Sequence, residues 1–219
     1  MSVSDKVLQL KQDFDDVYEA GQKERWNFIT NNGTRRNCNY EFCQTNLSYF
    51  EPYTDLQPEH ATYMFSQTGG KIDLVEKFEK YGTKLDFSNC TVPDRCFYIS
   101  NITRVGVIDC TKFANLNYFF MYDYYLHTID KMIVPKGLTY NNTFTSCTGL
   151  VEIRFEGEIG NNINFADCKN LSHDSLMSII NHLETKTSGT FTLSIGSTNL
   201  AKLSDAEKAV ATEKGWTLA

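Results

Sequence analysis

The chain has 219 residues, of which 41% are hydrophobic and 22% charged, and its formal net charge is -6 at pH 7. This length and composition indicate one globular domain with a small terminal element. The negative charge disfavours nucleic acid and anionic membranes as partners, because both attract basic proteins. No run of eighteen apolar residues occurs, so the sequence predicts no transmembrane helix.

Residues 1–30 predict a helix with one apolar seam. Val3, Val7, Leu10, Phe14 and Val17 are spaced alternately by four and three residues, as at the a and d positions of a coiled coil. Two heptads are too few to hold a coiled coil in water. Two roles of the seam stay open: it starts a homo-oligomer, or it packs on the open end of the rest of the chain. The segment has no apolar signal-peptide core, so we expect a soluble protein made in the cytoplasm.

Residues 31–60 predict a loop-rich connection. Asn31-Asn-Gly33 is a turn signal, and Pro52 and Pro58 interrupt regular structure. Cys38 and Cys43 are not accompanied by a second pair of zinc ligands, so we expect no metal site here.

Residues 61–219 carry an imperfect repeat of about 21 residues. The clearest copy is Ile102-Thr-Arg-Val-Gly-Val-Ile-Asp-Cys110, an L-x-x-L-x-L-x-x-C pattern. Such a period is typical of a leucine-rich-repeat solenoid, in which each repeat needs its neighbours to bury its apolar face. We therefore predict an α/β fold, a leucine-rich-repeat solenoid whose apolar tripeptides form a short parallel sheet. The equivalent fourth positions are predicted to be Leu85, Val105, Met132 and Ile153.

Aromatic and sulfur-containing residues also follow the repeat. The aromatic segment at residues 117–126 is expected to form the wall of the core opposite the sheet, with an exposed adhesive patch as the alternative. The recurring Cys90, Cys110, Cys147 and Cys168 are expected to be small buried hydrophobes beside a turn, rather than disulfide partners or metal ligands.

From about residue 171, local signals predict a terminal α/β cap that covers the last apolar layer of the solenoid. Each signal marks the start or end of one helix or strand. In chain order they are the helix N-cap Ser172, the alternating residues 191–195, the capping box Ser204/Glu207, the helix stop Gly215 and the strand-like residues 216–218.

The sequence lacks signals of catalysis. The four His residues are scattered, Gly69-Gly70-Lys71 lacks phosphate-loop spacing, and neither a serine-nucleophile motif nor a zinc-protease motif occurs. We therefore expect a protein that is not an enzyme and that uses no metal and no cofactor.

The outer face of the sheet is the candidate partner-binding surface. Residues between the inward apolar ones should point outward, and one such row is predicted to contain Lys84, Arg104, Lys131 and Glu152. Stacked cations repel one another unless something compensates. The row is either an anion-binding stripe for an acidic protein or sugar acid, or a solvated face neutralised by Asp86 and Asp130. The complete candidate face is Lys84, Asp86, Arg104, Lys131, Ile133, Glu152 and Arg154.

A family resemblance accompanies these patterns. Residues 142–155, Asn-Thr-Phe-Thr-Ser-Cys-Thr-Gly-Leu-Val-Glu-Ile-Arg-Phe, resemble the BspA-type leucine-rich repeat, with units of the form F-x-x-C-x-x-L-x-x-I. Residues 171–180, 198–209 and 214–218 resemble the end cap of such proteins from gut Firmicutes and their phages or prophages, and residues 10–21 are similar to their N-terminus. The resemblance implies a solenoid with a binding or structural role and no catalytic residues.

From the resemblance we expect a non-enzymatic phage or prophage protein that recognises a protein or glycan through the sheet face. One role is a virion tail or fibre component that oligomerises through the N-terminal seam. The alternative is an intracellular phage effector that binds a host protein, such as a component of a defence system. A bacterial surface adhesin is a further alternative, although it would need an export signal. In the first two cases synthesis takes place in the cytoplasm of a bacterial host, and a virion is a further destination.

Overall fold

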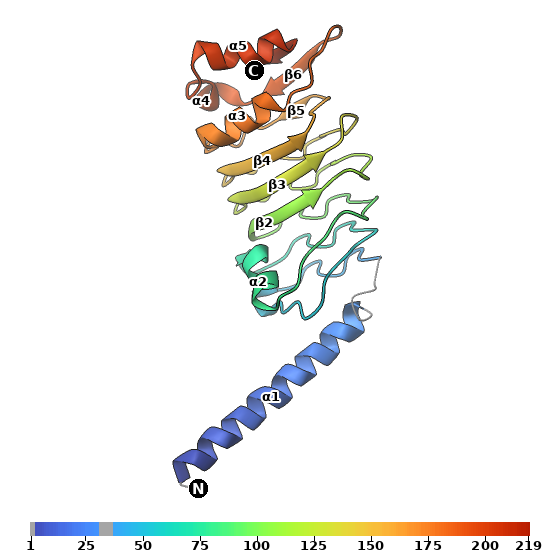
Figure 1. Cartoon of the computed structure of the whole chain (residues 1–219), viewed down its shortest axis with the longest axis vertical. Coiled ribbons are helices and arrows are strands. Elements are labelled where there is room, and N and C mark those ends of the chain that lie inside the picture. The colour runs from blue at the N-terminus through green and yellow to red at the C-terminus, as the bar shows by residue number, and fades with distance from the viewer. Residues whose placement is uncertain (1–2, 31–36) are drawn as a thin grey trace.

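The computed structural model describes residues 3–30 and 37–219, and its fold is mixed α/β with short parallel sheets and helices (Figure 1). The predicted turn at residues 31–33 lies outside the described residues. Helix α1 (Val3–Thr30) projects from one end of a stacked body, and the C-terminal elements lie at the other end. No described helix is both long and apolar enough to cross a bilayer.

Four parallel strands form the main sheet in chain order: β1 (Ile72–Asp73), β2 (Ile102–Asp109), β3 (Thr128–Val134) and β4 (Glu152–Gly157). Their inward apolar side chains are in register, since Val105 pairs with Ile129 and Ile129 with Ile153. Parallel neighbours in chain order require the chain to return to the start of the sheet after every strand. Those return segments form the opposite side of the core.

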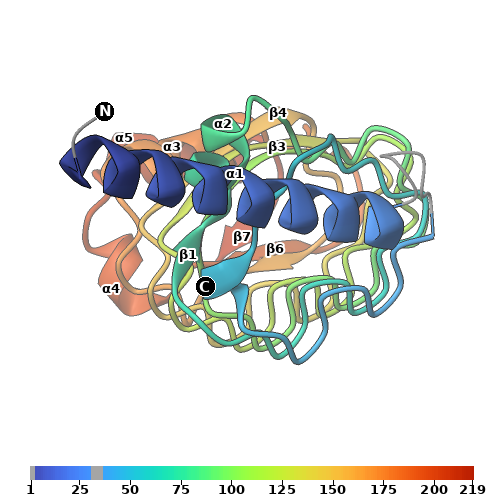
Figure 2. The same cartoon turned by 90° about the horizontal axis from the view of Figure 1, so that it is seen from below.

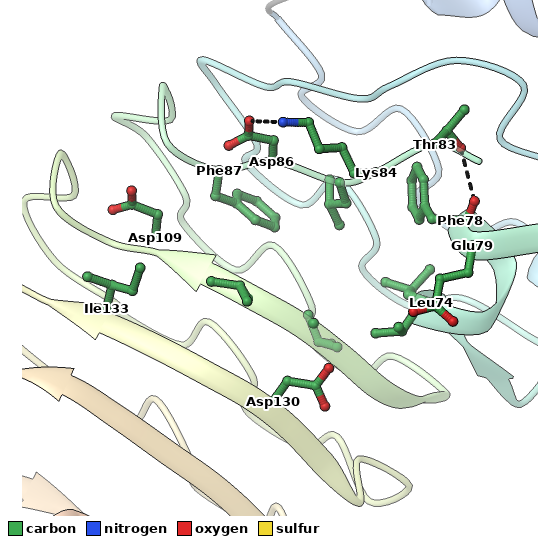
Figure 3. A pocket seen from close by; sticks show the side chains of 15 residues that line it. Leu74, Phe78, Glu79, Thr83, Lys84, Asp86, Phe87, Asp109, Asp130 and Ile133 are labelled. Carbon is green, nitrogen blue, oxygen red and sulfur yellow. Dashed lines mark hydrogen bonds and ion pairs between the residues drawn. The ribbon is translucent and has the colours of Figure 1, made fainter. Parts of the chain in front are cut away.

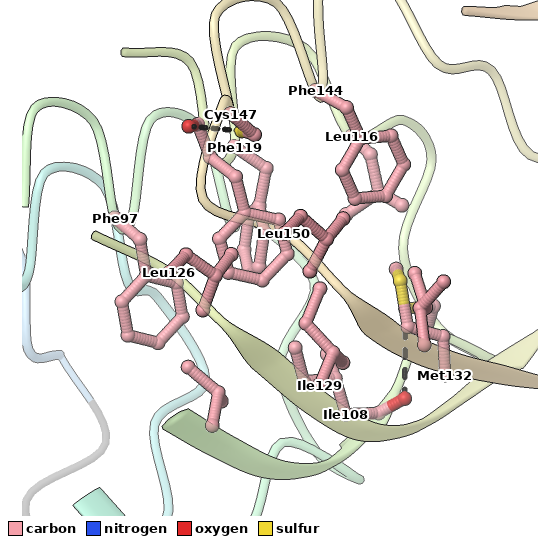
Figure 4. Packing of buried hydrophobic residues seen from close by; sticks show 14 of the residues in the cluster. Phe97, Ile108, Leu116, Phe119, Leu126, Ile129, Met132, Phe144, Cys147 and Leu150 are labelled. Atoms are coloured by element: carbon pink, nitrogen blue, oxygen red, sulfur yellow. Dashed lines mark hydrogen bonds between the residues drawn. The ribbon is translucent and has the colours of Figure 1, made fainter. Parts of the chain in front are cut away.

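A column of stacked phenylalanine rings runs through the return segments. Neighbouring ring centroids are 4.4 to 5.9 Å apart, and every ring in the column is buried. Figure 4 shows Phe97, Phe119 and Phe144 on the side of the core opposite the strands. The column explains the aromatic segment at residues 117–126: Phe119 and Phe120 are core, as predicted, while Tyr124 and Tyr125 are exposed. In chain order the column is Phe42, Phe65, Phe97, Phe120, Phe144 and Phe165.

Backbone hydrogen bonds divide the body into layers that begin at residues 37, 60, 92, 115 and 139, which we call layers 1 to 5. Layer 1 consists mostly of turns, as expected for a loop-rich segment before residue 61, but it packs as part of the stacked body. The Cys38 amide donates to the His60 carbonyl at 2.8 Å, and the Phe42 amide donates to the Met64 carbonyl at 2.9 Å. Leu47 in the short 3-10 helix η1 (Leu47–Tyr49) is buried with them. The layer escaped prediction because it pairs through single bridges instead of through a periodic strand.

Helix α2 (Leu74–Lys80) changes the predicted register in layer 2. Asp73 caps it by accepting a hydrogen bond from the Glu76 amide at 3.0 Å, so the chain leaves the sheet directly after β1. Leu85 consequently pairs with Leu56 of layer 1 and is not equivalent to Val105, which pairs with Ile129. The predicted equivalence of these two positions was wrong because a helix of two turns is inserted after β1 and before Leu85.

The C-terminal unit confirms the local signals. Strand β5 (Ile163–Asn164) pairs with β6 (Phe191–Ser194), which pairs with β7 (Trp216–Leu218). Helix α3 (His173–Asn181) is capped by Ser172, and α5 (Asp205–Glu213) begins with the predicted capping box. The five-residue helix α4 (Gly196–Leu200) was not expected. Gly215 has a φ of 82°, a left-handed conformation that suits a helix stop.

All seven cysteines lie in the described part of the chain, and none of them is in a disulfide. Six are buried, among them the four that were predicted to be small core residues, and Cys43 is partly buried. Burial raises the pKa of the Cys90 thiol to about 12 and the pKa values of Cys96 and Cys110 well above their ordinary range. These thiols are therefore protonated at neutral pH and poor nucleophiles.

The apolar seam of α1 does not pack on the stacked body, which corrects one of its two predicted roles. Val7, Leu10, Phe14 and Val17 are 60 to 73% exposed, and the side chain of Val3 lies outside the described part. Figure 2 shows α1 crossing the end of the body where layer 1 lies. The other role, self-association, stays a prediction.

A candidate partner-binding groove beside helix α2

The predicted row of cations is not a row in the structure. Arg104 pairs with Thr128, and Thr128 with Glu152, whereas Lys131 lies opposite Val107. β2 and β3 pair with a constant offset of 24 residues instead of the 27 that a row of Arg104 and Lys131 requires, and the pairing of β1 with β2 and of β3 with β4 is irregular. The sequence pattern could not locate these shifts, because they depend on neighbouring strands.

Each of the three cations is matched by a carboxylate. The Arg104 guanidinium donates to both carboxylate oxygens of Asp130 at 2.8 Å, and these hydrogen bonds raise the pKa of Arg104. Lys131 and Glu156 are 2.8 Å apart, and Lys84 and Asp86 are 3.1 Å apart. The face is thus neutralised by Asp86 and Asp130, as the second interpretation predicted, with Glu156 in addition.

Three other residues of the predicted face have different positions. The Glu152 carboxylate accepts hydrogen bonds from the hydroxyls of Ser172 at 3.0 Å and Ser175 at 3.3 Å, so it holds the start of α3. Arg154 is exposed, and no described residue forms an ion pair with it. Ile133 lines a groove between α2 and the sheet.

This groove has a volume of 460 Å³ and lies where layer 2 departs from the sheet (Figure 3). Its α2 side presents Leu74 and Phe78, and its strand side ends at Asp109 and Ile133. Sequence analysis did not identify it, although Asp73 as an N-cap before apolar residues at positions 74, 75 and 78 was a usable helix signal. The apolar lining residues are Leu74, Val75, Phe78, Leu85, Phe87, Val105, Val107 and Ile133.

One edge of β2 is open within the groove. On the side of layer 4, β2 pairs with β3 from Arg104 to Asp109; on the side of layer 2 it pairs with β1 at Ile102 and Arg104. No residue in the described part of the chain pairs with residues 105–109 on that second side. Because the backbone groups of successive strand residues point to opposite edges, only alternate residues of this segment offer unpaired backbone groups to the groove.

The opening is local, because layers 2 and 3 remain hydrogen-bonded elsewhere. The Phe65 amide donates to the Cys96 carbonyl at 2.7 Å, and the Gln67 amide donates to the Tyr98 carbonyl at 2.9 Å. Bridge-paired residues of layers 2 and 3 lie 32 residues apart (His60 and Val92), compared with 23 between layers 1 and 2 (Asn37 and His60). The additional residues form α2 and the walls of the groove.

Gly106 controls how closely α2 approaches the sheet. A Cβ atom at this position would lie 3.3 Å from the Cγ2 atom of Val75, so a side chain there requires Val75 to move by a few tenths of an ångström. The next residue, Val107, is 47% exposed. The strand thus presents one residue without a side chain beneath the helix and one apolar side chain to the groove.

The groove carries a surplus of negative charge. Its lining contains four carboxylates, from Glu79, Asp86, Asp109 and Asp130, and one amine, from Lys84. Asp86 and Asp130 are paired with Lys84 and Arg104, but within the described residues Glu79 and Asp109 have no ion-pair partner. Asp109 accepts hydrogen bonds from the amide and hydroxyl of Thr111, which hold its carboxylate without neutralising it.

Apolar contact, carboxylates and backbone hydrogen-bonding groups are thus what this site offers a ligand. Among the described residues, no three His, Cys, Asp or Glu side chains are grouped so that they could hold a metal ion. In comparisons with known proteins, no protein-family model, no curated protein and no solved structure matches the chain.

Proposed function

We propose that the chain is a leucine-rich-repeat solenoid of the BspA type that acts as a non-enzymatic protein-binding module through the groove beside α2. The solenoid assignment is supported by parallel strands in chain order, by the phenylalanine column and by the regular spacing of hydrogen-bonded layers. The binding role is carried by one observation: an apolar groove lies against an unpaired strand edge. Its volume falls in the range of about 300 to 1,000 Å³ that ligand sites occupy.

A protein ligand fits this site better than a glycan. Backbone groups at a strand edge match another polypeptide backbone, which pairs with them in register. The groove's rings, Phe78 and Phe87, are buried, so their faces are not free to stack on a sugar. Nucleic acid is disfavoured by the unpaired carboxylates of Glu79 and Asp109.

Selection from a random peptide display library on the immobilised full chain tests this function. We expect enriched peptides to bind the wild type and to lose binding to Val107→Arg, which places a long side chain in the groove. Val92→Arg is the matched control, because Val92 is a similarly exposed valine (39%) that does not line the groove. A selection without binders, or with binders that tolerate Val107→Arg, contradicts the proposed function.

The exposed seam of α1 favours one setting for this function, a component of a phage virion that self-associates through the helix. Light scattering on the full chain after size exclusion checks it. A trimer that Leu10→Asp converts to a monomer supports the virion role. A monomeric wild type refutes the self-association and favours an effector that binds a host protein inside the cell.

A further inference from the structure

We infer that the ligand of this groove is an extended basic peptide segment that adds a strand to the open edge of β2. The inference rests on the proposed function, because it names the chemistry of the partner at the same site. Strand addition supplies affinity through main-chain hydrogen bonds and specificity through alternate side chains. The open residues 105–109 correspond to about 17 Å of extended chain, enough for a short peptide strand.

The chain's own layer 2 does not fill the position beside β2. The segment after α2 is held to layer 1: the Thr83 hydroxyl donates to the Pro52 carbonyl at 2.6 Å, and the Lys84 amide donates to the Asp55 carboxylate at 2.9 Å. The Asp86 amide likewise donates to the Leu56 carbonyl at 2.9 Å. Since no described residue pairs with residues 105–109 on this edge, we infer that a strand added there comes from another molecule.

The groove also determines which side chains such a strand should carry. Successive side chains of a strand point to opposite sides. One set would contact the partly exposed apolar side chains of Val75 and Leu85. The other set would reach the rim, where Glu79 and Asp109 lack ion-pair partners among the described residues. An alternation of apolar residues with lysine or arginine meets both requirements.

A labelled heptapeptide of alternating lysine and valine is the probe, with fluorescence anisotropy as the measurement. We expect it to bind the wild type and to bind Glu79→Lys/Asp109→Lys about tenfold more weakly, a change of about 1.4 kcal/mol. The control Glu158→Lys/Glu213→Lys alters the net charge equally at exposed positions outside the groove and should bind like the wild type. A glutamate–valine heptapeptide should bind weakly to the wild type.

Backbone pairing is tested separately from charge. We use two N-methylated forms of the lysine–valine peptide. One is methylated on the backbone nitrogens of its valines and the other on those of its internal lysines. Each form therefore lacks the N–H donors along one edge of the peptide strand. One of the two should bind about tenfold more weakly than the parent, and the parent should slow hydrogen exchange of amides in residues 105–109.

Three outcomes overturn the inference: no binding of the lysine–valine peptide, equal binding by both methylated forms and the parent, or equal binding to the charge-reversed protein. Each of these leaves the proposed function standing if display selection still yields peptides that depend on Val107. The proposed function fails only when groove-dependent peptides are absent, so the two failures are distinguishable.

Discussion

Asp123 is a buried carboxyl group at a position where the neighbouring layers carry neutral side chains. It follows the stacked Phe120 by three residues and is 0% exposed. The Ser100 hydroxyl donates to its Oδ2 atom at 2.5 Å, and its Oδ1 atom has no hydrogen-bond partner. Burial raises the pKa of Asp123 well above its ordinary value, more than the hydrogen bond from Ser100 and the weaker backbone contacts of Tyr125 and Leu126 lower it.

The raised pKa sets the sign of a pH dependence. The folded protein keeps the proton of Asp123 while the unfolded chain releases it above pH of about 4, the ordinary pKa of aspartate. The favourable contribution of the protonated form is therefore complete below that pH. It is lost with rising pH, by about 1.4 kcal/mol per pH unit, until the pKa of the folded state is passed.

Asp123→Thr should remove this dependence. In layer 2 the equivalent Thr68 is buried and donates to the Phe65 carbonyl three residues earlier, so a threonine can be accommodated at this place in a layer. We expect urea unfolding to show that, above pH of about 4, the free energy of unfolding of the variant rises relative to that of the wild type by about 1.4 kcal/mol per pH unit. Asp15→Thr, at an exposed position on α1, is the control. A difference between wild type and Asp123→Thr that does not change with pH would refute the reasoning.

Two further predictions concern packing. Gly106→Val places a side chain against Val75 and should lower the free energy of unfolding by about 1 to 3 kcal/mol through overpacking, measured by thermal denaturation; an unchanged stability would mean that α2 is not held against β2. Phe97→Ala removes a ring that stacks on Phe65 at 5.3 Å and on Phe120 at 5.2 Å, and should cost about 3 to 5 kcal/mol in urea unfolding. An unchanged stability of Phe97→Ala would contradict the role of the column.

Local signals predicted the elements that local interactions create. Ser172, the Ser204/Glu207 box and Gly215 each act within a few residues of their position, so the sequence was sufficient to place α3, α5 and β7. The buried cysteines were predictable for a related reason: they recur beside the stacked phenylalanines, as in Phe144 and Cys147. Their burial follows from the repeat, without knowledge of which residues surround them.

Long-range pairing limited the rest of the prediction. Layer 1 is held by single backbone bonds to residues 22 or more positions away, and irregular segments of this kind leave no apolar period in the sequence. The candidate site was missed for the same reason. Lys84, Asp86 and Ile133 of the predicted face line the groove, but an open strand edge is defined by a neighbouring segment that leaves the sheet, which no local pattern reports.

Helix α2 could be explained as a cover that protects the edge of β2 from unwanted pairing, as helices do in many sheets. The geometry argues for more than protection. A protective helix would occupy the space along residues 105–109, yet a groove of 460 Å³ remains there, with Val107 exposed and two carboxylates without ion pairs among the described residues. Gly106 lets α2 approach β2 closely at one point, while the segment after α2 is hydrogen-bonded to layer 1. The insertion of α2 therefore keeps layers 2 and 3 apart beside residues 105–109. Function is expected at a position where a repeat is interrupted in this way.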